Sequence, residues 1–274
     1  MTNPTKAFRD FEQAGWLQPD VCQTYHGFFA NLTTQSVEGL LDVAQVSSGS
    51  IVLDVACGAG YVAGTAAARG AKVTGVDFSP TMLKLARQSY PMVRFEEGDA
   101  ERLPFADESF DAVVNNFGKP HFADPKTATT EALRILKSGG YYAFTVWAAP
   151  HKAIAFGAVY QAVVAFGTLH VGLPPLPKSF VLSKPEHCKR CLIQAGFVTP
   201  HVVNLPCVLR VSSLDRVFES IASGTVWLAA LLKAQSPVAL ARIKQAVVDK
   251  ISTFAVDGHY EIPMPALLAY GMKP

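Results

Sequence analysis

The sequence predicts an α/β protein built on a doubly wound, mostly parallel β-sheet. Between residues 51 and 147, short runs rich in β-branched and aromatic residues alternate with stretches of helical periodicity. The first run, Ile51–Val55, is apolar apart from one aspartate, as in strands that are buried on both faces. Two helix starts in this region combine a capping side chain with a proline at the first helical position. Together these three patterns are typical of a parallel sheet with crossover helices.

Five strands are expected in this region, at 51–55, 72–76, 93–96, 110–115 and 141–147. The helices between them carry their own start and stop signals. Gly70 is a natural C-terminal cap for a helix over 61–69, and Ser79 is the N-cap of the next helix. Asp124 is expected to cap a third helix, which Gly139-Gly140 should end.

The flanking segments differ in character, and the chain is predicted to divide into four units. Residues 1–45 form an amphipathic helical cap, and residues 46–150 form the core. Residues 151–182 form an apolar helical insertion with a proline-rich loop. Residues 183–274 supply the remaining part of the sheet together with lid helices.

The last unit has weaker signals than the core. Ser183 to Glu186 matches the capping-box pattern and is expected to begin a helix. A sixth strand is expected over 201–211, and residues 213–254 predict two helices broken at Ser236-Pro237. A final strand over 262–272 contains two prolines, which indicate a sheet edge or a bulge.

The charge balance narrows the class of ligand. Lysine and arginine total 24 residues against 22 aspartates and glutamates, for a net charge of +2, and no basic stripe or acidic block is present. This balance disfavours nucleic acid as a partner. Half of the 274 residues are hydrophobic and 17% are charged, so a sizeable core and a small neutral substrate are expected.

Cysteine usage and the termini predict a cytoplasmic protein. Five scattered cysteines do not form a disulfide framework, and no signal peptide follows Met1. The apolar segment 153–169 is too short for a membrane span, so stable membrane insertion is not expected. The pair Cys188 and Cys191 lacks a matching second pair of ligands, and no metal is predicted. We expect a monomer or a homodimer.

A glycine turn marks the candidate cofactor site. Gly58-Ala59-Gly60 follows the first strand and leads directly into a helix, which lets the backbone turn tightly and approach a ligand. Asp77 ends the second strand, where a carboxylate can accept hydrogen bonds from both hydroxyls of a ribose. The turn also satisfies a loose dinucleotide pattern, so NAD remains an alternative at this point.

Two further aspartates favour a cofactor that carries an amino acid. Asp54 lies within the first strand, four residues before Gly58, where a carboxylate is costly unless it is paired. An α-ammonium group would be a suitable partner, whereas a pyrophosphate would be repelled. Asp99 lies at the tip of the third strand, where it can accept a hydrogen bond from an adenine amino group.

Four ordered motifs carry a resemblance to a known family. The segments VLDVACGAG, GVDFSP, EEGDAERLPFADESFDAVV and EALRILKSGG resemble the class I S-adenosylmethionine-dependent methyltransferases. The resemblance covers about residues 50–147 and is strongest to the small-molecule methyltransferases of ubiquinone and menaquinone biosynthesis. It implies S-adenosyl-L-methionine as cofactor and a Rossmann-like, seven-stranded sheet whose final strand is antiparallel. In this sequence Ala56 replaces a common first glycine, which is tolerated if that position lies further from the ligand.

The resemblance also implies roles for individual residues. The methionine part of the cofactor would be held by Asp54, Ala56, Gly58 and Gly60, and the ribose by Asp77. The adenine would lie against Phe78 and Met82, with Asp99 and Ala100 at its edge. Tyr25 and His26, in the N-terminal helical region, could close over the cofactor, and the resemblance favours Tyr25 over His26.

The acceptor side has weaker signals. The fourth strand leads into Asn115–His121, so Asn115 is expected to lie near the transferred methyl group. His121 is the candidate general base, because histidine titrates near neutral pH. The alternative is a histidine that only holds the loop before the next helix. Aliphatic side chains around the strand ends favour a small, largely apolar acceptor.

The predicted function is therefore the transfer of a methyl group from S-adenosylmethionine to a small, apolar molecule. Two alternatives remain open. One is a protein that binds the cofactor without methylating an acceptor, and the other is an NAD-dependent oxidoreductase.

Overall fold

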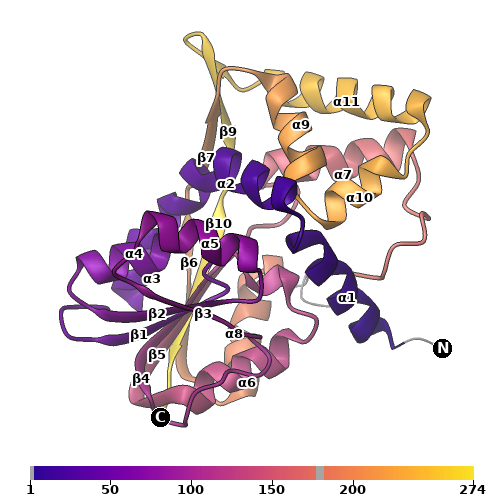
Figure 1. Ribbon diagram of the computed structural model, residues 1–274. Coiled ribbons are helices and arrows are strands. Elements are labelled where there is room, and N and C mark those ends of the chain that lie inside the picture. The colour runs from indigo at the N-terminus through magenta and orange to yellow at the C-terminus, as the bar shows by residue number, and fades with distance from the viewer. Residues whose placement is uncertain (1–2, 177–181) are drawn as a thin grey trace.

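A seven-stranded sheet forms the centre of the computed structural model, which describes residues 3–176 and 182–274 (Figure 1). Its spatial order is β3-β2-β1-β4-β5-β10-β6. The strands are β1 (Ile51–Val55), β2 (Lys72–Asp77), β3 (Arg94–Glu97), β4 (Phe110–Asn116), β5 (Leu136–Trp147), β6 (Val198–Leu205) and β10 (Ala266–Met272). The first five are parallel, whereas β10 is antiparallel to both of its neighbours. The fold class expected from the sequence is confirmed.

Helices cover both faces of this sheet, as doubly wound folds require. One face packs against α3 (Val37–Val43), α4 (Tyr61–Ala68) and α5 (Pro80–Ser89). The opposite face packs against α6 (Pro125–Ile135) and α8 (Pro185–Ala195). Ser79 and Asp124 cap α5 and α6 through their side chains, as their positions before proline predict.

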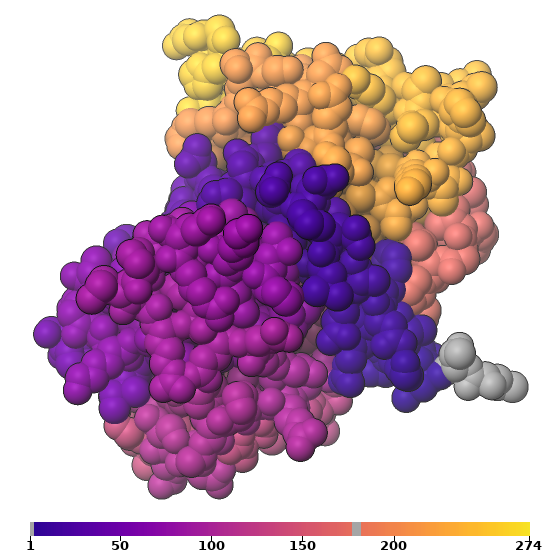
Figure 2. Space-filling model, in the orientation of Figure 1, coloured from indigo at the N-terminus to yellow at the C-terminus, as the bar shows by residue number. Residues whose placement is uncertain are grey.

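The remaining elements form a second, smaller body above the strand ends (Figures 1 and 2). Its helices are α1 (Pro4–Trp16), α2 (Pro19–Thr33), α7 (Ile154–Phe166), α9 (Leu214–Gly224), α10 (Trp227–Lys233) and α11 (Pro237–Ser252). A three-stranded sheet of β7 (Val208–Val211), β8 (Ala255–Val256) and β9 (His259–Pro263) belongs to it. We call this body the cap. Its apolar core joins α2, α7, α9, α10 and α11.

Two predicted strands are each divided between the two sheets. The segment 201–211 belongs partly to β6 and partly to β7, and the segment 262–272 belongs partly to β9 and partly to β10. Prolines cause both divisions, since a residue without an N–H cannot continue a hydrogen-bonded ladder. Pro206 separates β6 from β7, and Pro265 lies between β9 and β10. The prolines therefore mark strand ends, and β10 is an interior strand of its sheet rather than an edge.

Three helix boundaries also differ from expectation. Residues 213–254 form three helices, because the backbone is extended at Thr225 as well as broken before Pro237. The helix α6 ends at Ile135, and Gly139-Gly140 lies within β5, where the pairing with β4 shifts register. The capping box at Ser183 does not form. The residue before a proline is pushed to an extended conformation, so Lys184 becomes the N-cap of α8 and makes no side-chain cap bond.

The apolar helix of the cap is short. Residues 153–169 include the predicted helix as α7, which spans 13 residues, but only one face of it is buried, and Tyr160, Val164 and Phe166 are exposed. Among the described residues, no helix has both the length and the apolar character that crossing a membrane would require. The division at residues 45, 150 and 182 stays a prediction.

Candidate active site

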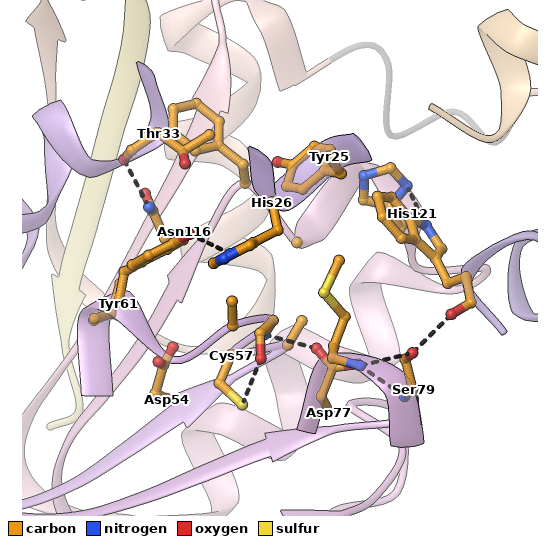
Figure 3. Close-up of a pocket in the computed structure, with 18 of the residues that line it drawn as sticks. Tyr25, His26, Thr33, Asp54, Cys57, Tyr61, Asp77, Ser79, Asn116 and His121 are labelled. Carbon is orange, nitrogen blue, oxygen red and sulfur yellow. Dashed lines mark hydrogen bonds between the residues drawn. The ribbon is translucent and has the colours of Figure 1, made fainter. Parts of the chain in front are cut away.

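A cavity lies beyond the carboxyl ends of β1, β2 and β4, between the sheet and the helices α1 and α2 (Figure 3). This is the point where the strand order reverses, and ligands of doubly wound sheets bind there. We call the side formed by β1, β2 and the turn into α4 the floor. The side formed by α1 and α2 is the roof, and it supplies Trp16, Tyr25 and His26.

Three residues of the glycine turn have a left-handed backbone. The φ angles are 54° at Ala56, 53° at Gly58 and 85° at Gly60. A Cβ at Gly58 would have no neighbour within 4 Å, so this position is open for the close approach of a ligand. At Gly60 a Cβ would lie 2.9 Å from Phe95, so glycine is also required for packing.

Ala56, which replaces a common first glycine, lines the cavity and a second, adjoining one. Its positive φ is a conformation that L-residues with a Cβ adopt at a cost of about 1–2 kcal/mol. A Cβ at Gly118 would lie 2.6 Å from the Cβ of Ala56, so the two positions are sterically coupled.

Asp54 has an incomplete hydrogen-bond set. Its side chain is 1% exposed, and Oδ2 accepts a hydrogen bond of 3.0 Å from the N–H of Ala63. In the described part of the chain, Oδ1 is one of two buried side-chain polar atoms that have no partner. Burial raises the pKa of Asp54 to about 8. A buried carboxylate that lines a cavity with one unused oxygen is suited to a cationic ligand group.

Both side-chain oxygens of Asp77 have a hydrogen-bond partner, in contrast to those of Asp54. Oδ2 of Asp77 accepts from the N–H of Gly58 and its Oδ1 from the N–H of Ser79, both at 2.9 Å. Burial raises the pKa of Asp77, and these backbone donors oppose that rise. Each carboxylate oxygen can accept a second hydrogen bond. Asp77 therefore holds the glycine turn in place and still offers acceptors to a ligand in the two cavities that it lines.

The adjoining cavity extends from Asp77 toward the tip of β3. It is lined by Phe78, Asp99 and Ala100, the residues expected at the adenine, whereas Met82 lines the first cavity. One oxygen of Asp99 accepts from the N–H of Glu101 at 2.8 Å. Two cavities that share Asp77 and Phe78 provide an elongated site, as a nucleoside joined to an amino acid requires.

Of two further predicted residues, Tyr25 lines the cavity and Asn115 does not. Tyr25 lines the roof and packs edge-on against Trp16, with ring centroids 5.1 Å apart. Asn115 is fully buried, and neither cavity is lined by it. Its amide donates to the carbonyl of Val55 and accepts from the N–H of Lys119, so its role is to join β4 to β1 and to the following turn. The residue of β4 that lines the cavity is Asn116.

His121 forms a polar cluster with α1. Its Nδ1 lies 2.8 Å from Oε2 of Glu12, and the indole Nε1 of Trp16 donates to the same Oε2 at 3.1 Å. Glu12 is 2% exposed, so this carboxylate is removed from solvent. A proton on Nδ1 would be donated to Glu12, and Nε2 would then be free to accept one. Sequence reasoning missed Glu12, because 109 residues separate it from His121.

A buried lysine supports the turn that carries His121. Lys119 begins the 3-10 turn η2 (Lys119–His121) and is fully buried. Its Nζ donates to the hydroxyl of Thr129 and lies 4.6 Å from the ring centroid of Phe144. Burial lowers the pKa of Lys119, which reduces the cost of placing this amine in the core. Lys119 therefore anchors η2 to α6 through Thr129 and to β5 through Phe144.

A second side-chain pair in the cavity was not predicted. His26 of α2 and Tyr61, the first residue of α4, are joined by a hydrogen bond between Nδ1 and the phenol hydroxyl (Figure 3). The two rings are nearly parallel, at 5°. Burial raises the pKa of Tyr61 to about 12, so the phenol keeps its proton at neutral pH. Among the described residues, no group of three or more metal-ligating side chains is present.

Comparison with known proteins places this site in context. The family model of a methyltransferase domain matches residues 53–144. The chain is similar to demethylmenaquinone methyltransferases. It is 38% identical to that of Thermus thermophilus over 57% of this chain and 78% of the relative. It is 44% identical to that of Deinococcus radiodurans over 54% and 68%, and 50% identical to that of Chlorobaculum parvum over 32% and 37%. The chain therefore spans little more than a third of the Chlorobaculum relative.

Solved structures share the fold over more of the chain. A candidate methyltransferase of Bacillus halodurans C-125 is 26% identical, with a TM-score of 0.54, and the match covers 87% of this chain and 98% of the other. The phosphoethanolamine N-methyltransferase 2 of Haemonchus contortus, solved with S-adenosyl-L-methionine, is 19% identical with a TM-score of 0.59. That match covers 97% of this chain and 60% of the other, and at this identity it supports the fold alone.

Proposed function

Because the chain belongs to the class I S-adenosylmethionine-dependent methyltransferases of the ubiquinone and menaquinone type, we propose that it methylates a small, largely apolar acceptor. The observation that carries this proposal is the buried, unpartnered Oδ1 of Asp54 in a cavity at the strand switch point. S-adenosylmethionine, the cofactor of this family, supplies an electrophilic methyl group on a sulfonium when it is bound. The residues present fit this group better than they fit NAD, which has no ammonium to offer Asp54.

The floor would hold the cofactor through two carboxylates. Asp54 would pair with the α-ammonium, which completes its hydrogen-bond set and compensates for the burial of its charge. Asp77 would accept from the ribose hydroxyls through the second lone pairs of its oxygens. The side chains of Phe78 and Met82, and the adjoining cavity with Asp99 and Ala100, would take the adenine.

The acceptor would lie between the roof and the end of β4. Phe117, whose ring stacks on Trp147 with centroids 4.0 Å apart, lines this part of the cavity together with Ala30 and Tyr25. Among the described residues that line the cavity there is no lysine or arginine. An anionic acceptor would therefore lack a strong cationic partner. A hydroxylated aromatic or quinol-type acceptor fits this lining, and the relatives named above act on a demethylated menaquinone by their names.

We propose His121 as the base that deprotonates the acceptor hydroxyl. With its proton on Nδ1, His121 would donate a hydrogen bond to Glu12, which would leave Nε2 to act as the proton acceptor. Buried Glu12 also stabilises the imidazolium that forms when His121 takes the proton. Glu12 is in this scheme a positioning residue, and it acts only through His121.

A labelled-methyl assay tests the proposed function. Purified protein would be incubated with S-adenosylmethionine labelled on its methyl group and with a panel of phenols, quinols and thiols. We expect label to appear in a phenol or quinol product and to be lost in Asp77→Ala. Good cofactor binding without label transfer to the panel or to a cell extract would instead indicate a protein that binds the cofactor for another purpose.

A further inference from the structure

The hydrogen-bonded pair of His26 and Tyr61 lies at the same end of the cavity as Asp54. Asp54 accepts its one hydrogen bond from Ala63, in the first turn of α4, and Tyr61 begins that helix. Figure 3 shows Tyr61 and His26 above Asp54, on the side of the cavity opposite His121. All of these residues except Ala63 line the cavity. Whatever ligand group approaches Asp54 is therefore close to this pair as well.

The hydrogen bond between Tyr61 and His26 links the tautomer of the imidazole to the phenol. When the protonated phenol donates its O–H to Nδ1, the neutral imidazole carries its proton on Nε2. The pair thus presents an N–H donor that is not used by any hydrogen bond we identify in the described part of the chain. The amino-terminal end of α4 adds a partial positive charge at the same place.

Several other polar side chains that line the cavity are already engaged. The hydroxyl of Ser79 donates to the backbone carbonyl of Trp16 at 2.7 Å. The hydroxyl of Thr33 donates to the backbone carbonyl of Phe29 at 3.1 Å. The amide of Asn116 donates to the carbonyl of Thr33 at 3.0 Å. His121 is held by Glu12 on the opposite side. No lysine or arginine is present among the described lining residues, and Tyr25 lines the roof against Trp16. His26 is bonded to Tyr61 at the start of α4, the helix whose backbone binds Asp54, so His26 is the donor best placed beside Asp54.

We propose that Nε2–H of His26, with its tautomer fixed by Tyr61, binds the α-carboxylate of S-adenosylmethionine. This inference rests on the proposed function, which assigns the neighbouring α-ammonium to Asp54. The two charged groups of an amino acid share one carbon atom, so their partners must lie close together. Asp54 and the pair line the same cavity, and both adjoin the first turn of α4. The carboxylate is then recognised by a neutral imidazole and a helix terminus in place of an arginine.

The pair also connects two parts of the molecule. His26 belongs to α2, which packs into the cap, and Tyr61 belongs to α4, which packs on the sheet. A carboxylate bound at His26 would therefore strengthen the contact between cap and core. A ligand that lacks the amino acid would leave that contact unchanged.

Calorimetric titration with two thioethers tests the assignment without measuring turnover. S-adenosylhomocysteine carries the amino acid, and 5′-methylthioadenosine is the corresponding nucleoside without it. In His26→Phe we expect the affinity for S-adenosylhomocysteine to fall about 10-fold or more, the range for a lost hydrogen bond to a charged group. The affinity for methylthioadenosine should stay within about twofold of wild type.

Three further variants complete the design. His26→Gln keeps an N–H donor and should recover part of the loss. Tyr61→Phe frees the tautomer of His26 and should weaken S-adenosylhomocysteine alone, by about two- to fivefold. His201→Phe changes a histidine that stacks on Tyr270 at the distant strand β6 and should change neither affinity.

The possible results separate the two proposals. Equal losses for both ligands in His26→Phe, or no loss for either, would overturn the carboxylate assignment while the proposed function stands. An unchanged S-adenosylhomocysteine affinity in Tyr61→Phe would overturn the role of the tyrosine. If the wild-type protein binds neither thioether, both the assignment and the proposed function are wrong.

Discussion

The floor of the cavity is held by backbone groups, whereas its roof is held by side chains. On the floor, Asp54 and Asp77 accept hydrogen bonds from the N–H groups of Ala63, Gly58 and Ser79. On the roof, Glu12 meets His121, and His26 meets Tyr61, through side chains that come from distant parts of the sequence. The floor is therefore preformed by the sheet, and the roof depends on how α1 and α2 dock. We expect the floor to dominate cofactor binding, with a contribution from His26 of the roof, and the pair of Glu12 and His121 to govern the reaction.

The largest expected effect comes from His121, which pairs with Glu12 of the roof. His121→Ala should lower kcat by about 10²- to 10⁴-fold, the usual range for a general base, and leave the affinity for S-adenosylhomocysteine near that of wild type. Steady-state kinetics and calorimetry of the same preparation measure both quantities. His151→Ala, at an exposed position before α7, is the matched control. Near-normal turnover in His121→Ala would leave this histidine with only the structural role of holding η2.

The second-largest effect is the loss of cofactor affinity that we expect when Asp77 is replaced. Asp77→Ala removes the acceptor of two backbone hydrogen bonds in addition to the ribose contacts. We expect the affinity for S-adenosylhomocysteine to fall by about 100-fold or more and the melting temperature to drop. Calorimetry and thermal denaturation measure the two effects. An unchanged affinity would refute the assignment of the ribose to Asp77.

Cofactor binding should release a proton from Asp54, the floor carboxylate that has one oxygen without a partner. With a pKa of about 8, Asp54 of the ligand-free protein is mostly protonated at pH 6.5, and pairing with an ammonium requires it to ionise. Cofactor binding at pH 6.5 should therefore release close to one proton per site. Calorimetry in two buffers of different ionisation enthalpy counts that proton, and Asp54→Asn should abolish its release. Equal proton release in both proteins would contradict the assignment.

The same carboxylate makes the stability of the ligand-free protein depend on pH. The folded state holds a proton on Asp54 that the unfolded state, with a pKa of 3.8, gives up. The resulting stability is complete at low pH and is lost as the pH rises from about 4 through about 8. Asp54→Asn should remove this part of the pH dependence, so its melting temperature should exceed that of wild type most clearly at pH 8.

The smallest expected effect concerns the strained residue of the floor. Ala56→Gly relieves a left-handed backbone but loosens the unfolded chain, so a net gain of about 0.5–1 kcal/mol in the free energy of unfolding is expected. Chemical denaturation at fixed pH measures it. A destabilised Ala56→Gly would mean that contacts of the alanine methyl outweigh the strain.

The difference between floor and roof also explains what the sequence could predict. The five parallel strands, the glycine turn, Asp54 and Asp77 follow signals that lie within a few residues of one another. Ser79 and Asp124 act as caps because their side-chain oxygens accept N–H groups of the first helical turn, and the proline that follows each is suited to the first helical position. These are local rules, and the fold and the predicted residues of the floor follow from them.

The roof follows no local rule. Glu12 and His121 lie 109 residues apart, and His26 and Tyr61 lie 35 apart, so their pairing depends on the docking of α1 and α2. Asn115 and Asn116 could not be distinguished by composition, and the alternation of side chains along β4 decides that only the second lines the cavity. The assignment of β6 and β10 to one sheet and β7 and β9 to another likewise depends on contacts over long sequence distances.

The strand order has a consequence for the folding of the chain. β10 lies between β5 and β6 and pairs with both, although it follows both in sequence. β6 therefore has no partner in the large sheet until β10 arrives, and the sheet cannot grow by adding strands in the order of their synthesis. Closing such long loops is slow, because their entropy is lost before the new contacts form. During translation, the parallel half from β1 to β5 can pair early, while one side of β5 stays open until the last strand is inserted.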